Sequence, residues 1–218
     1  MSIQDRKERE KEMRRKQIQA AAKQLFMEKG YRATSIEDIA KLAELSPATI
    51  YLYFNSKDEL YASLNRETLQ FLVRELEKIK RDRSLLPEEK LGLVKEALYQ
   101  TYLYDPLSLR IIFYLQLDDT LLNLDKEVLE TMNKVGRQGL TLMAEIFEEG
   151  VAAGKFIPGQ GMLHADIMWA IFAGVVMWEE AKTKMNPNKD FLKPTLFEAF
   201  DLFCRGLARE GNRTDPGG

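Results

Sequence analysis

Apolar residues recur at intervals of three and four along almost the whole chain, the spacing that places them on one face of an α-helix. No stretch alternates apolar and polar residues between turn signals, as a half-buried strand would. The pattern therefore predicts an all-α protein of about nine helices. Gly30 ends the first amphipathic helix as a C-terminal cap. The apolar stripe of that helix consists of Ile18, Ala21, Ala22, Leu25 and Phe26.

Three helix starts follow Gly30 in quick succession, and each has a residue suited to capping. These residues are Thr34, Ser46 and Ser56. A glutamate stands three residues after the first and the third, which is the spacing of a capping box. Pro47 follows the second, at the first helical position, where a missing N–H costs nothing. The caps predict two short helices, 36–43 and 47 to about 54, and a long one that ends near Arg83.

The two short helices are the most informative feature of the chain. A helix of about eight residues does not persist alone, so both must pack against a longer neighbour. Leu45 fills the turn between them, which is typical of a helix-turn-helix, here at residues 35–54. In such a motif the outward residues at the start of the second helix lie in the major groove of DNA.

The side chains on this predicted surface suit a DNA duplex. Ser and Thr hydroxyls bond base edges, alanine meets a thymine methyl, and Tyr and Lys suit phosphate oxygens. Lys57 opposes the helix dipole in the first turn of its helix, which indicates a nearby anion, although a plain surface lysine is the alternative. The predicted DNA-contacting residues are Thr34, Ser46, Pro47, Ala48, Thr49, Tyr51, Tyr53 and Lys57.

Charge and composition narrow the class of protein. Residues 1–57 carry 12 Lys/Arg and 8 Asp/Glu, whereas residues 58–218 carry 20 and 26. A basic N-terminal part suits phosphate contacts, although a solvated charge-rich helix shows the same excess. One cysteine and one histidine form neither a disulfide nor a Cys/His zinc site, so we expect no metal and no cofactor. No apolar run is long enough for a membrane span or a secretory signal, which predicts a cytoplasmic protein.

An uninterrupted apolar run, Ile167 to Trp178, predicts a homodimer. A helix that is apolar all round and too short for a bilayer is buried on every side, by its own subunit and by a second one. The final helix has a complementary apolar stripe. The predicted interface consists of Ile171, Val175, Trp178, Leu196, Phe200, Phe203 and Leu207. Two recognition helices about 34 Å apart would then read both halves of a palindrome.

Several of these positions together resemble the signature of the tetracycline-repressor (TetR) family of transcriptional regulators. The matching residues are Gly30, Tyr31, Thr34, Ile39, Ala40, Thr49, Ile50, Tyr51, Tyr53, Phe54, Lys57 and Leu60. The chain departs from the signature at Glu44, where the turn usually carries glycine, so Glu44 must become left-handed or alter the turn. The expected domains are a DNA-binding domain at 12–72 and an effector-binding and dimerisation domain at 73–210, with disorder at 1–11 and 211–218.

The resemblance implies a repressor that binds a palindromic operator as a dimer and is released by a small, hydrophobic effector held among the middle helices. The candidate pocket residues also suit a plain core, and both interpretations stay open at this point. These candidates are Phe113, Tyr114, Leu117, Met143, Phe147, Trp169 and Phe172. A helix-turn-helix protein with a protein partner instead of DNA is the main alternative. An enzyme is the weakest alternative, because His164 lies in no nucleophile motif and no Gly-rich phosphate loop follows a strand.

Overall fold

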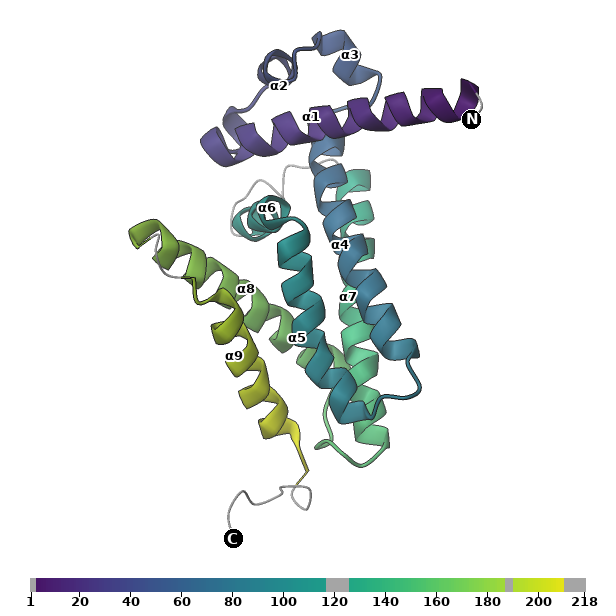
Figure 1. Cartoon of the computed structure of the whole chain (residues 1–218), viewed down its shortest axis with the longest axis vertical. Coiled ribbons are helices and arrows are strands. Elements are labelled where there is room, and N and C mark those ends of the chain that lie inside the picture. The colour runs from purple at the N-terminus through teal and green to yellow at the C-terminus, as the bar shows by residue number, and fades with distance from the viewer. Residues whose placement is uncertain (1–2, 117–125, 187–189, 210–218) are drawn as a thin grey trace. The chain divides into compact units, whose positions relative to one another are not determined.

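The computed structural model describes residues 3–116, 126–186 and 190–209 (Figure 1). Within these ranges the chain forms nine α-helices and no strand, which confirms the predicted all-α fold. The helices are α1 (Ile3–Ala33), α2 (Ile36–Leu42), α3 (Pro47–Tyr51), α4 (Lys57–Arg81), α5 (Pro87–Tyr104), α6 (Pro106–Gln116), α7 (Lys126–Ala152), α8 (Gly161–Met185) and α9 (Leu192–Leu207).

The chain divides into two compact units. The first comprises Met1–Thr68 and Pro106–Asn133, and the second comprises Leu69–Asp105 and Lys134–Gly218. The predicted boundary between residues 72 and 73 lies close to the first of these breaks. The return of α6 to the first unit was not anticipated, because a contact between distant segments leaves no mark in local periodicity.

The first unit is built around the apolar face of α1. Ile18 on α1, Ile39 on α2 and Ile50 on α3 are completely buried in one cluster. Three aromatic rings join α1 to α4 in this cluster, with ring centroids 5.3 to 6.0 Å apart. They belong to Phe26, Tyr31 and Tyr61. Short helices α2 and α3 are therefore held by a shared core, as their length requires.

Helix α1 begins earlier than predicted and breaks where predicted. Residues 1–11 were expected to be disordered, but from Ile3 onward the chain is helical. An ion pair at i,i+4 spacing between Arg6 and Glu10, at 3.0 Å, stabilises this polar extension locally. The helical backbone is interrupted at Gly30, whose φ of 82° and ψ of 162° suit a residue without Cβ. The predicted cap at Gly30 is thus confirmed, whereas the predicted tail at 211–218 lies outside the described residues.

The second unit packs α9 against both α5 and α8. Phe172 and Val176 of α8 are completely buried in it, as are Leu196 and Phe200 of α9. Two charged side chains, Lys90 and Glu179, are also buried in this unit. The Lys90 Nζ donates to both oxygens of the Glu149 carboxylate, at 2.7 and 3.0 Å.

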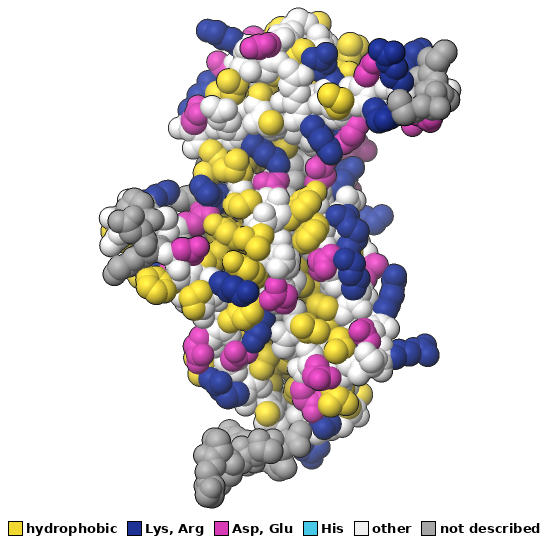
Figure 2. Space-filling view, in the orientation of Figure 1, with side chains coloured by type: hydrophobic (Ala, Val, Ile, Leu, Met, Phe, Trp, Pro, Cys, Tyr) yellow, Lys and Arg dark blue, Asp and Glu magenta, His cyan; other side chains and the backbone are white. Residues whose placement is uncertain are grey.

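Helix α8 combines a buried face with an exposed apolar one. Its length and apolar composition alone would suffice to cross a membrane, a test that the core helices of soluble proteins also pass. Hydrophobic side chains are visible at the surface in the region of α8 and α9 (Figure 2). The exposed apolar residues of these two helices include Leu163, Ile167, Trp178 and Leu202.

Candidate nucleic-acid interface

The first cap of the helix-turn-helix is Ser35. Its Oγ accepts the Asp38 N–H at 3.1 Å, and the Asp38 carboxylate accepts the Ser35 N–H at 2.9 Å. The predicted box of Thr34 with Glu37 was therefore wrong by one residue. Thr34 is buried, and its hydroxyl donates to the Gly30 carbonyl at 2.8 Å. Thr34 with Glu37 and Ser35 with Asp38 both place a hydroxyl and a carboxylate three residues apart. The two pairs differ in the burial of Thr34, which the sequence does not reveal.

The Asp38 carboxylate also closes the corner between α1 and α2. Lys29 Nζ donates to it at 2.6 Å, and the Ser35 hydroxyl donates at 2.7 Å. These contacts hold the pKa of Asp38 well below its ordinary value, the lysine contact most strongly and the serine hydroxyl and amide next.

The turn between α2 and α3 has the left-handed residue that the sequence suggested. Glu44 has a φ of 54°. The Leu45 N–H donates to the Ala40 carbonyl at 2.9 Å, and the Glu44 N–H donates to the Lys41 carbonyl at 3.3 Å. This is the Schellman arrangement, in which glycine is preferred at the position that Glu44 fills. The turn therefore keeps the Schellman hydrogen bonds, and Glu44 adopts the left-handed backbone conformation that is unfavourable for a residue with a side chain.

The second cap is as predicted. The Ser46 Oγ accepts the Thr49 N–H at 3.1 Å, and Pro47 is the first residue of α3. The Ser46 and Thr49 hydroxyls lie 2.8 Å apart, so they bond each other. Helix α3 ends at Tyr51, three residues earlier than predicted.

The third cap, at the start of α4, differs from the prediction in one bond. The Ser56 Oγ accepts the Glu59 N–H at 3.0 Å, as predicted. The Glu59 carboxylate accepts the Asn55 N–H at 2.7 Å and so caps the residue before Ser56.

Seven of the eight predicted DNA-contacting residues retain exposed surface, six of them between Ser46 and Tyr53 and the seventh, Lys57, at the start of α4. Ser46, Ala48 and Tyr51 are exposed. Pro47, Thr49 and Tyr53 are partly exposed, while Ile50 between them is completely buried in the core. Because Ile50 points into the core, the Thr49 hydroxyl and the Tyr51 phenol on either side of it face outward. Thr34 does not join this surface.

Lys57 has partners within the protein. Its Nζ donates to the Tyr31 and Thr34 carbonyl oxygens, both at 2.9 Å, and lies 4.2 Å from the centroid of the Tyr31 ring. Burial lowers its pKa. A lysine in the first turn of a helix predicts a nearby negative potential. Two carbonyl dipoles and an aromatic ring supply that negative potential, so Lys57 joins α4 to the end of α1.

Two further side chains, besides Lys29, attach α1 to the helix-turn-helix. Gln17 Nε2 donates to the Ala43 carbonyl at 2.7 Å, which satisfies an end carbonyl of α2. The Arg15 guanidinium donates to the Tyr53 carbonyl at 3.3 Å and lies 4.3 Å from the centroid of the Phe54 ring.

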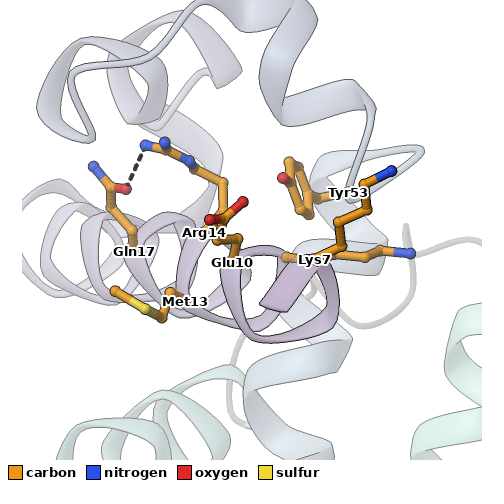
Figure 3. Close-up of a pocket in the computed structure, with 7 residues that line it drawn as sticks. Lys7, Glu10, Met13, Arg14, Gln17 and Tyr53 are labelled. Atoms are coloured by element: carbon orange, nitrogen blue, oxygen red, sulfur yellow. Dashed lines mark hydrogen bonds between the residues drawn. The ribbon is translucent and has the colours of Figure 1, made fainter. Parts of the chain in front are cut away.

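A groove of about 730 Å³ lies between the N-terminal part of α1 and Tyr53 (Figure 3). Tyr53 is the one side chain of this groove among the predicted DNA-contacting residues, although a helical spacing of basic residues was visible in the sequence of α1. The groove is lined by Lys7, Glu10, Lys11, Met13, Arg14, Gln17 and Tyr53.

The predicted pocket residues are distributed over both units. Met143, Phe147 and Phe172 are completely buried in the second unit. The Phe147 ring stacks on His164, with centroids 3.9 Å apart. Phe113 is buried in the first unit. The side chain of Tyr114 and all of Leu117 lie outside the described residues, and the cavity stays a prediction. Trp169 is partly exposed and its ring meets Phe172 edge-on, with centroids 5.7 Å apart.

The predicted dimer residues also separate into two groups. Leu196, Phe200 and Leu207 are buried within the subunit. These three side chains therefore belong to the subunit's own core, and their place in a dimer interface stays a prediction. Trp178 is exposed, whereas Ile171, Val175 and Phe203 are partly exposed.

Comparisons with known proteins agree with this geometry. The family described as "Bacterial regulatory proteins, tetR family" matches residues 18–64. The chain is 32% identical to the "Fatty acid metabolism regulator protein" of Bacillus subtilis over 66% of this chain and 71% of the relative. It is also 32% identical to the "HTH-type transcriptional regulator QacR" of Staphylococcus aureus, over 64% of this chain and 71% of QacR.

Solved structures show the same fold over nearly the full length. The crystal structure of the transcriptional regulator FadR from Bacillus subtilis in complex with stearoyl-CoA matches with a TM-score of 0.69 and 26% sequence identity. The match covers 88% of this chain and 98% of FadR.

A capped helix-turn-helix on an all-α fold, shared with regulators of this kind, defines a DNA-binding, ligand-responsive transcriptional regulator and not an enzyme. The chain belongs to the tetR family of bacterial regulatory proteins.

Proposed function

We propose that the chain is a cytoplasmic repressor that binds a palindromic operator as a homodimer and is released by a hydrophobic effector with a long acyl chain. The outward surface of α3 carries the DNA-binding part of this proposal. Ser46 and Thr49 present hydroxyls, and Tyr51 presents a phenol that is 51% exposed. Groups of this kind bond base edges and phosphates without adding charge.

The exposed apolar stripe on α8 supports the homodimer. Leu163, Ile167, Trp178 and Met185 are exposed, and their separations of four, eleven and seven residues place them on one side of the helix. Phe172 and Val176 lie on the opposite side of α8 and pack in the subunit's own core. A contiguous apolar stripe at the surface of a water-soluble regulator favours association with a second copy.

The effector class is inferred from the relatives. The Bacillus subtilis FadR structure contains stearoyl-CoA, and the relative from the same organism is named for fatty acid metabolism. A fatty acyl chain matches the buried, largely aromatic character of Met143, Phe147 and Phe172. We therefore infer that this chain responds to a long-chain acyl thioester.

Selecting bound fragments from a random duplex pool tests the DNA-binding part. We expect a palindrome, with binding that weakens steeply as salt rises because counterions are released. Tyr51→Phe should weaken binding roughly two- to tenfold through the lost hydrogen bond. Tyr104→Phe is the matched control, since Tyr104 is 50% exposed but lies in the second unit.

If no duplex is recovered, or if binding does not depend on the salt concentration, the alternative of a protein partner is favoured.

The effector is tested with stearoyl-CoA, which should raise the melting temperature of the protein and release the selected duplex. Free coenzyme A is the control and should do neither. Equal effects of the two compounds would contradict an acyl-chain effector.

A further inference from the structure

Three basic side chains on α1 form a row that the helix-turn-helix does not use. Lys7, Lys11 and Arg14 are separated by four and three residues, which places them on one side of the helix. All three are exposed. They line the groove whose other side is formed by Tyr53, whose ring lies over the part of α1 that carries Lys7 and Arg14 (Figure 3).

The row has a net positive charge that the protein leaves largely uncompensated. Glu10 is the acidic residue in the groove lining, and Arg6 neutralises it at 3.0 Å. Lys7 and Lys11 form no ion pair or hydrogen bond with any residue that the structure describes. Like charges at i,i+4 destabilise a helix. An external anion would relieve this repulsion between Lys7 and Lys11.

The row is held in place beside the helix-turn-helix. Arg14 donates to the Gln17 side chain at 2.9 Å (Figure 3). Gln17 in turn donates to the Ala43 carbonyl at the end of α2. Arg15 bonds the Tyr53 carbonyl from the same part of α1. The basic row therefore keeps a defined position next to the surface that Tyr51 and Tyr53 present.

We propose that this row extends the DNA interface by binding the phosphate backbone of the duplex that α3 reads. Seven residues of α-helix rise about 10 Å, which matches the axial length of about three phosphates on one strand. Because the side chains are flexible cations that meet only phosphates, they add affinity without sequence preference. This inference rests on the proposed function and specifies a second part of the same interface.

Salt dependence of binding to a duplex of random sequence tests the proposal, because non-specific binding is electrostatic and needs no known operator. The test variant is Lys7→Gln with Lys11→Gln. The matched control is Arg9→Gln with Lys16→Gln, which removes the same charge from the other side of α1. The slope of log K against log salt should fall by about 1.8 in the test variant, about 0.9 for each lost phosphate contact, and remain near the wild-type slope in the control.

A variant with Lys7→Arg and Lys11→Arg should keep the wild-type slope, and circular dichroism should show the same helix content in all proteins. Equal slopes in the test and control variants would overturn the proposal, whether both fall or both stay unchanged. If the wild-type protein binds no duplex at any salt concentration, the proposed function itself fails. Binding by the wild type with no difference between the faces of α1 would refute only the phosphate-binding row.

Discussion

Single residues of the helix-turn-helix bear conformational strain and charge that can be measured. Glu44 fills a left-handed position at a φ of 54°, where an L-residue with a side chain is disfavoured. The partly exposed carboxylate of Asp38 bonds both the Ser35 cap and Lys29. Both residues shape the turns that orient α3, so their effects should appear in the stability of the first unit.

Replacing Glu44 with glycine should stabilise the protein by about 0.5–1 kcal/mol. Glycine relieves the left-handed strain, although it adds freedom to the unfolded chain. Denaturant unfolding followed by circular dichroism measures the change. Glu44→Ala keeps the strain and is the control, so a gain as large as that of glycine would show that charge, and not backbone conformation, is responsible.

Asp38 should make stability depend on pH in the acid range. Its folded pKa lies below its unfolded value near 3.9, so the unfolded state takes up a proton first as the pH falls. The contribution of Asp38 is thus fully present above about pH 4 and is lost below it. The stability difference between wild type and Asp38→Asn should be largest near neutral pH and shrink below pH 4. A difference that does not change with pH would contradict this linkage.

At the scale of elements, the end of α7 is determined by a close contact between a glycine and an aromatic ring. The Lys155 and Phe156 N–H groups both donate to the Gly150 carbonyl, at 2.9 and 3.3 Å. Gly154 supplies the positive φ, 71°, in the turn. The chain then places the buried Phe156 ring directly against the Cα of Gly150.

A methyl group at position 150 should therefore be costly. Its Cβ would overlap the Phe156 ring, which is buried and stacks on Phe147 at a centroid distance of 5.9 Å. Gly150→Ala should destabilise by about 1–2 kcal/mol, since overpacking outweighs the gain in helix propensity. The comparison is Gly161→Ala, where the atoms nearest to the added Cβ are Oε1, Cδ and Cγ of Glu148, a flexible and exposed side chain that can move away. Thermal unfolding should show a lower melting temperature for the first variant alone.

At the scale of the whole molecule, the two units present different surfaces. The first presents a polar, partly basic surface, and the second presents exposed apolar residues on α8 and α9, among them Trp178 and Leu202. Burying these apolar residues between two copies would add the second recognition helix that a palindromic operator requires.

Charge placed among the exposed apolar residues of α8 and α9 should separate the subunits. Trp178→Glu and Leu202→Glu each put an unpaired carboxylate into the proposed interface, at positions that are 59% and 58% exposed in the subunit. Light scattering coupled to size-exclusion chromatography should show monomers, and affinity for the selected palindrome should fall. Leu86→Glu is the matched control, because Leu86 is 56% exposed but lies outside α8 and α9. Unchanged mass in all three variants would exclude this interface.

The sequence by itself determined the features that depend on residues within about four positions of one another. The helical spacing, the Ser46 cap with Pro47, the break at Gly30 and the unusual residue at Glu44 are local, because hydrogen bonds at helix ends join near neighbours. These features sufficed to predict the all-α fold, the helix-turn-helix and most of its outward surface.

Tertiary structure decided everything that depends on which side chains become buried by distant segments. It selected Ser35 over Thr34 as the cap, and it gave Lys57 carbonyl partners 23 and 26 residues away. It also turned Leu196, Phe200 and Leu207 toward the subunit's own core. The sequence around an apolar or cationic residue does not reveal which partner that residue will contact. The partner is determined by packing between elements that are far apart in the chain.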